Sequence, residues 1–158
     1  MKQEVEPGIR HKFWELLSLE EMNQKEWDAL CDRCGKCCLH KLEDEETGKV
    51  YTTRVVCRLF DIQKCCCINY SQRTKLVPTC KVISPETTDV FFYLPTTCAY
   101  RLLSEGRQLE WWHPLISGNM ETVHEAGISI KEKAVPENMV NLDQLESFIE
   151  ELNSYPMF

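Results

Sequence analysis

The chain has 158 residues, enough for one domain with a buried core and too few for two large domains. Acidic residues outnumber basic ones by 25 to 18, and this balance disfavours a protein that follows the phosphate backbone of a nucleic acid or an anionic membrane surface. Hydrophobic residues make up 43% of the sequence, which excludes a wholly disordered chain.

The first residues, Met1 to Pro7, carry no apolar run after Lys2, so they do not predict a secretory signal. No stretch reaches the ~20 apolar residues that a membrane-spanning helix needs. We therefore expect a cytoplasmic protein that makes no membrane contact. In that reducing compartment clustered thiols more often hold metal than form disulfides, and the disulfide interpretation returns only if the chain is exported.

Residues 1–17 are expected to form a lead-in to a metal-binding body over residues 18–130. Two capping-box patterns, Ser18 to Glu21 and Asn23 to Glu26, predict helix starts. The second predicts a short helix over residues 24–31, which leads into the first cysteine loop.

Beyond that loop the sequence predicts short extended pieces and irregular backbone. Residues 39–42 and 50–56 are predicted to be extended on either side of an acidic turn, because the second piece is rich in Val, Thr and Tyr. Residues 57–80 show little periodicity and contain five cysteines, so they are expected to need metal or cross-links to stay ordered.

The remainder of the chain predicts further short elements and a final helix. Helices are predicted to begin at Pro85 and to cover residues 98–104 and 119–125, and residues 128–130 alternate like a short strand. A C-terminal helix is predicted over residues 140–153. Its apolar stripe would consist of Leu142, Leu145, Phe148, Ile149 and Leu152.

Helices and short strands are mixed here without a regular alternation, which favours an α+β fold. We expect one small domain over residues 1–158, with irregular cysteine-rich loops tied by metal, short strands and a C-terminal helix.

The strongest functional signal is a run of four cysteines within eight residues: Cys31, Cys34, Cys37 and Cys38. Two residues between cysteines let a tight turn aim both sulfurs at one point, and Gly35 permits the backbone conformation that such a turn needs. Bacterial ferredoxins present three cluster ligands at this spacing and zinc knuckles use the same unit, so the spacing indicates metal without selecting which metal. A redox dithiol is the alternative, but the surrounding βαβ pattern is lacking.

The other cysteines are Cys57, Cys65, Cys66, Cys67, Cys80 and Cys98. Two four-cysteine sites would use eight of the ten, so two sites, or one iron–sulfur cluster and one zinc, fit the count best. Neighbouring side chains on an extended backbone point to opposite sides, so Cys37 and Cys38 need not serve the same ion. His40 follows the run and is either a ligand, a hydrogen-bond donor behind a ligand, or an exposed turn histidine.

These stretches resemble the bacterial CxxCxxCC cysteine-cluster family, in particular its YcgN-like branch. The matching segments include Trp27 to Leu42, Leu94 to Leu102 and the motifs that hold His113 and His124. The resemblance implies a protein that chelates zinc or iron, with Cys66 as the one departure from the family's cysteine pattern. The ligands it implies are Cys31, Cys34, Cys37, Cys38, Cys57, Cys65, Cys67, Cys80 and Cys98.

We therefore predict a metal-binding protein with two metal centres, zinc being slightly preferred over an iron–sulfur cluster because zinc tolerates irregular ligand spacing. The alternative is an iron–sulfur redox protein, or a component of an enzyme, with a cluster at Cys31, Cys34, Cys37 and a remote cysteine. A zinc-based nucleic-acid binder is disfavoured by the acidic charge. The sequence assigns no catalytic residue and no protein partner.

Overall fold

The computed structural model describes residues 7–78, 80 and 82–149. The α-helices are α1 (Phe13–Leu16), α2 (Gln24–Ala29), α3 (Arg73–Leu76), α4 (Ala99–Ser104), α5 (Pro114–Ser117) and α6 (Thr122–Glu125). The 3-10 helices are η1 (Leu19–Glu21), η2 (Lys36–Cys38), η3 (Tyr70–Gln72), η4 (Pro85–Tyr93), η5 (Glu137–Met139) and η6 (Leu142–Phe148). The strands are β1 (Leu39–Glu43), β2 (Val50–Val56), β3 (Phe60–Asp61), β4 (Cys66–Cys67) and β5 (Val135–Pro136). This mixture of short helices and strands confirms the α+β class.

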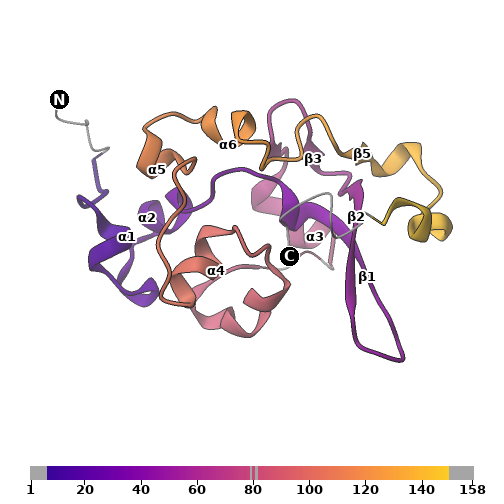
Figure 1. Ribbon diagram of the computed structural model, residues 1–158, viewed down its shortest axis with the longest axis horizontal. Helices are drawn as coiled ribbons and strands as arrows, with labels where there is room; N and C mark the ends of the chain where they lie inside the picture. The colour runs from indigo at the N-terminus through magenta and orange to yellow at the C-terminus, as the bar shows by residue number, and fades with distance from the viewer. Residues whose placement is uncertain (1–6, 79, 81, 150–158) are drawn as a thin grey trace.

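The predicted extended pieces form an antiparallel hairpin of β1 and β2, which projects at the lower right in Figure 1. The short strand β5 adds to β2 in parallel, and β3 pairs with β4 in a separate two-stranded sheet. Because the hairpin aligns Leu39 with Val56, the residues just outside it meet as well, and Cys57 N–H donates to the Cys38 carbonyl at 2.9 Å. The hairpin therefore brings two distant cysteines together.

Both predicted capping boxes are confirmed, the second of them at the start of α2. The Asn23 side chain accepts the Glu26 backbone N–H at 2.9 Å, and the Glu26 carboxylate accepts the Asn23 N–H at 3.0 Å. These bonds satisfy amide groups that have no partner within the helix. The start of α2 is thereby fixed, and the chain leaves its end directly into the cysteine run.

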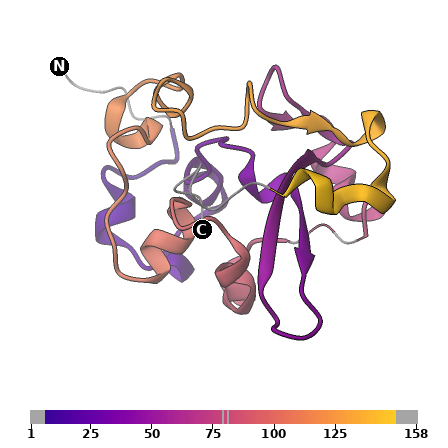
Figure 2. The same cartoon turned by 45° about the vertical axis from the view of Figure 1, so that its right-hand side comes forward.

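A layer of apolar side chains joins α2 to α4. Trp27 and Tyr100 lie with ring centroids 4.8 Å apart, and the Tyr100 hydroxyl donates to the Trp27 carbonyl at 2.7 Å. Phe13, Leu30 and Phe91 are buried beside them. In Figures 1 and 2 the chain that follows α2 crosses the middle of the molecule from this helical part to the hairpin.

Two predicted elements differ from the structure. Residues 128–130 are not a strand: Ile128 and Ile130 are buried, and their alternation reflects packing into two apolar clusters. The described part of the predicted C-terminal helix is the 3-10 helix η6, interrupted by a kink at Gln144, and Ile149 follows it in an isolated bridge to Thr53. Residues 150–153 of that prediction, with Leu152, lie outside the described residues.

Candidate metal centre

The cysteine run folds as a knuckle in which two residues adopt left-handed backbone conformations. Arg33 has φ 62° and Gly35 has φ 79°, so the chain reverses direction after Cys31 and again after Cys34. The buried Asp32 carboxylate accepts the Cys34 N–H at 3.0 Å, and the Gly35 carbonyl accepts the Cys38 N–H at 3.0 Å. These bonds fix the knuckle before any ligand is bound.

The packing around the knuckle explains why position 35 is glycine. A Cβ atom there would lie 2.6 Å from Phe60 Cζ and 2.7 Å from Ile130 Cγ1, both shorter than a tolerable contact. Ile130 also donates its N–H to the Cys34 carbonyl at 2.9 Å. The knuckle is thus held from outside by the segment that was predicted to be a strand.

Backbone N–H groups oppose part of the effect of burial on the thiols. Burial raises the pKa of Cys31 and Cys34, and the N–H groups of Arg33 and Lys36 offset part of that rise. At the start of α4, burial raises the pKa of Cys98, and the N–H of Arg101 offsets part of the rise. A donor aimed at sulfur favours the thiolate, which is the form that binds metal.

Four thiols lie close enough to affect one another's ionisation and form the first sulfur set, which consists of Cys31, Cys34, Cys37 and Cys98. Thiolate formation at Cys37 raises the pKa of each of the others, charge on Cys98 raises that of Cys34, and charge on Cys31 raises that of Cys98. This set joins the knuckle to a cysteine far along the chain, as a remote fourth ligand requires.

Burial opposes ionisation in most of the first sulfur set. It raises the pKa of Cys31 to about 12 and those of Cys34 and Cys98 further, although part of Cys31 remains open to solvent. Cys37 is the exception, with a pKa lowered to about 7, chiefly by a hydrogen bond with the Cys38 side chain. A cation that binds here must displace the protons of buried thiols.

The second sulfur set consists of Cys38, Cys57, Cys67 and Cys80. A hydrogen bond with Cys37 is the main cause that raises the pKa of Cys38, and burial is the main cause for Cys80. Charge on Cys57 and on Cys37 raises the pKa of both thiols, and charge on Cys67 adds to the rise at Cys80. The hairpin supplies Cys38 and Cys57, β4 supplies Cys67, and Cys80 follows α3. Cys37 and Cys38 share a side-chain hydrogen bond within the 3-10 helix η2, so the separation of these neighbours between two metal ions stays a prediction.

The remaining two cysteines, Cys65 and Cys66, lie apart from both sets. Cys65 is buried at φ 51°, and its electrostatic neighbours are Cys66, Asp61, Ser129 and Lys131. Charge effects between thiols thus connect eight of the nine predicted ligands, whereas the thiol that affects Cys65 is Cys66, and which cysteines bind metal stays a prediction. The spacing of Cys65 and Cys67 in the sequence does not predict that the two thiols have different neighbours. Their surroundings depend on which distant segment packs against each thiol.

Each of the histidines considered as ligands hydrogen-bonds to protein groups. His113 is buried, and its Nε2–H donates to the Leu30 carbonyl at 2.8 Å while its Nδ1 accepts the Leu115 N–H at 3.0 Å. Burial lowers the pKa of His113, so the ring stays neutral and secures the residue before Cys31. His40 Nε2 lies 2.9 Å from the Glu137 carboxylate, and His124 Nδ1 lies 2.6 Å from Ser129 Oγ.

Two lysines beside the sulfurs were not predicted from the sequence. Burial lowers the pKa of Lys36, which lies within the knuckle and is 1% exposed, and negative charge on Cys34 opposes part of that change. Burial likewise lowers the pKa of Lys41 on β1, with charge on Cys37 and Cys38 acting in the opposite direction. Lysine is rarely buried without compensating charge. The sequence signal that could have identified these two lysines is their position inside and just after the cysteine run.

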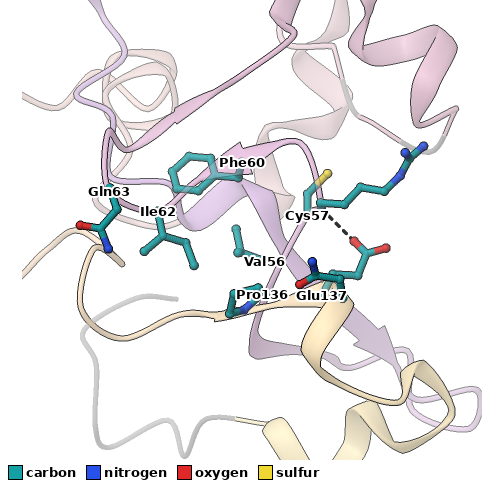
Figure 3. Close-up of a pocket in the computed structure, with 9 residues that line it drawn as sticks. Val56, Cys57, Phe60, Ile62, Gln63, Pro136 and Glu137 are labelled. Atoms are coloured by element: carbon teal, nitrogen blue, oxygen red, sulfur yellow. Dashed lines mark hydrogen bonds between the residues drawn. The ribbon is translucent and has the colours of Figure 1, made fainter.

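A pocket near Cys57 is shown in Figure 3. Val56, Phe60, Ile62 and Pro136 give it apolar walls, and the Cys57 sulfur points away from Pro136. The Glu137 carboxylate at its edge already accepts the Arg58 N–H at 3.0 Å and contacts His40. The carboxylate at the edge of this pocket is therefore already engaged by protein groups.

The sulfurs of each set lie near one another without meeting at one point. Among the residues that the structure describes, no three cysteine, histidine, aspartate or glutamate side chains stand close enough to hold an ion as they are. Protonated thiols do not attract one another, whereas loss of their protons to a cation supplies that attraction. The donor chemistry fits zinc or an iron–sulfur cluster, both of which accept four thiolates. No helix in the described ranges is long and apolar enough to cross a membrane.

Comparison with known proteins agrees with this geometry. The CxxCxxCC family, described as "Putative zinc- or iron-chelating domain", matches residues 30–99. A UPF0260 protein of Mesorhizobium japonicum is 56% identical over 119 residues, covering 75% of this chain and 80% of its own. UPF0260 proteins of Cellvibrio japonicus and Rhodopseudomonas palustris are 53% and 49% identical, each over 87% of this chain and over 93% and 81% of their own. No solved structure matches the chain. The chain therefore belongs to the UPF0260 family and carries the CxxCxxCC domain.

Proposed function

We propose that this protein binds two metal centres, one in each sulfur set, and that zinc is the preferred metal. The observation that supports the proposal is the folded knuckle, which presents four cysteines within eight residues and whose thiols are linked by charge effects to the distant Cys57, Cys80 and Cys98. Four thiolates satisfy the coordination of zinc, and a site closed in this way is structural because no position is left for a substrate. Cytoplasmic location is part of the proposal, since reducing conditions keep the thiols free.

An iron–sulfur protein is the second candidate, favoured by one observation. The first sulfur set combines the C-x2-C-x2-C run with the remote Cys98, which is the ligand pattern of a ferredoxin-type cluster. When bound, such a cluster would supply one-electron chemistry. The partial exposure of Cys31 and Cys37 places this set near solvent, where an electron partner could approach.

Purification under strict exclusion of oxygen, followed by elemental analysis, tests the proposal and separates the candidates. Zinc at about two ions per chain in colourless protein supports two zinc sites. Brown protein that contains iron and acid-labile sulfide supports the cluster instead. Protein that folds fully and retains neither metal contradicts both.

Paired cysteine variants test the assignment of ligands. Cys34→Ser removes a buried member of the first sulfur set, so we expect it to lose about one metal ion and a large part of the folding stability that ligation supplies. Cys66→Ser is the matched control, because Cys66 lies outside both sets, and it should keep full metal content and melting temperature. Equal metal loading of the two variants would show that Cys34 is not a ligand.

A further inference from the structure

Lys36 makes a contact that joins the two parts of the first sulfur set. It lies between Cys34 and Cys37 in the knuckle, and its Nζ donates to Thr97 Oγ1 at 3.2 Å. Thr97 directly precedes Cys98, the member of the set that comes from a remote segment. A single buried side chain thus connects two ligand loops that lie 61 positions apart in the sequence.

Lys36 is enclosed where it makes this contact, since the side chain is 1% exposed. A buried polar group costs free energy unless it is hydrogen-bonded, so the bond to Thr97 holds the Lys36 amine in one place.

We propose that Lys36 is a positioning residue for the first sulfur set, holding Cys98 beside the knuckle through its hydrogen bond to Thr97. The proposal rests on the proposed metal function and adds a residue that tunes it. Hydrogen-bonded groups behind the ligands are known to control metal affinity in this way.

Cobalt(II) titration of the reduced, metal-free full chain under anaerobic conditions tests this role, because thiolate-to-cobalt absorption reports the number of sulfur ligands. Lys36→Met removes both the hydrogen bond and the charge, and we expect it to weaken cobalt binding at the first sulfur set about tenfold or more. Its spectrum should move toward that of Cys98→Ser, as one sulfur is lost from the coordination shell. Lys49→Met, at the exposed tip of the hairpin, is the control and should bind cobalt like the unchanged protein.

Two substitutions at Thr97 separate the hydrogen bond from general packing. Thr97→Val keeps the shape and removes the hydroxyl, and we expect about threefold to tenfold weaker cobalt binding. Thr97→Ser keeps the hydroxyl and should restore the affinity and the spectrum. In a Cys98→Ser background, Lys36→Met should have little further effect, because the group it positions is gone.

The outcomes distinguish this inference from the proposed function. An unchanged chain that shows no thiolate-to-cobalt absorption contradicts metal binding itself. An unchanged chain with full tetrathiolate absorption, together with the same affinity and spectrum in Lys36→Met, overturns only the role of Lys36. If Lys36→Met does not fold, Thr97→Val decides the question: weakened binding supports the tether, and unchanged binding refutes it.

Discussion

At the scale of single residues, the knuckle depends on conformations that only a few side chains permit. Gly35 combines a positive φ with a space that Phe60 and Ile130 close on both sides. The neighbouring Arg33 also has a positive φ, although it carries a side chain, so part of the local backbone is strained. The sulfur positions of Cys31 and Cys34 follow from these turns, since the N–H that acts on each thiol belongs to the residue two positions later.

Replacing Gly35 by alanine should therefore be far more costly than an equivalent change elsewhere. Gly35→Ala is expected to destabilise the protein by about 3 kcal/mol or more, combining backbone strain with overpacking. Gly48→Ala is the matched control, because φ is 71° there and nothing lies within 4 Å of an added Cβ, so only the strain of about 1 kcal/mol should remain. Urea unfolding of both variants measures the difference, and equal losses would contradict the close packing around Gly35.

The ion pair between Arg10 and Glu26 makes the stability of the fold sensitive to acid. The Arg10 side chain donates to the Glu26 carboxylate and is the main cause that lowers its pKa from the usual 4.5 to about 2. A lowered pKa stabilises the fold at pH values above 4.5, and that contribution is lost as the pH falls from 4.5 toward 2. Glu26→Gln should therefore be less stable than the unchanged protein at neutral pH, with the gap narrowing over that range. Glu20→Gln, at an exposed position, should show no such gap when both are unfolded with urea.

At the scale of elements, α2 and α4 work as a pair that delivers the first sulfur set. The end of α2 leads into Cys31, and Cys98 stands immediately before α4. The contact of Trp27 with Tyr100 fixes the spacing of the two helices. The β1–β2 hairpin does the same for the second set by placing Cys38 against Cys57.

Loss of one hydroxyl should show how strongly the helix pair is coupled. Tyr100→Phe removes the hydroxyl that donates to the Trp27 carbonyl, which keeps the Leu30 N–H at 3.2 Å, so the expected loss of stability is that of one hydrogen bond, about 1 kcal/mol. Tyr70→Phe, at a residue that is 59% exposed, should change stability by less than about 0.5 kcal/mol. Thermal unfolding compares the two, and an unaltered melting temperature in Tyr100→Phe would show that the two helices do not depend on this bond.

Sequence patterns predicted the elements that depend on interactions between residues close together in the chain. The capping boxes before η1 and α2, the hairpin and the helix after Cys98 follow from short-range sequence signals, and the structure contains each of them. The segment around Ile130 was misassigned because alternating burial arises from packing between two clusters as well as from a strand. The division of the sulfurs into sets, and the burial of Lys36, depend on contacts between distant segments that spacing does not encode.

At the scale of the whole molecule, short elements and small apolar clusters surround the two sulfur sets. The buried residues form separate clusters rather than one continuous core, and Cys34 itself belongs to one of them. Ligation would link these clusters through the knuckle, so that metal binding and folding stability are one property. A chelator that removes the metal is therefore expected to lower the melting temperature of the entire domain.

X-ray absorption at the metal edge of anaerobically purified protein tests the central claim most directly, because it reports the atoms bound to the ion. Two four-sulfur zinc sites predict a first shell of sulfur alone, about four atoms at about 2.3 Å from zinc. A shell dominated by nitrogen or oxygen, in protein that carries its full complement of metal, would contradict the account.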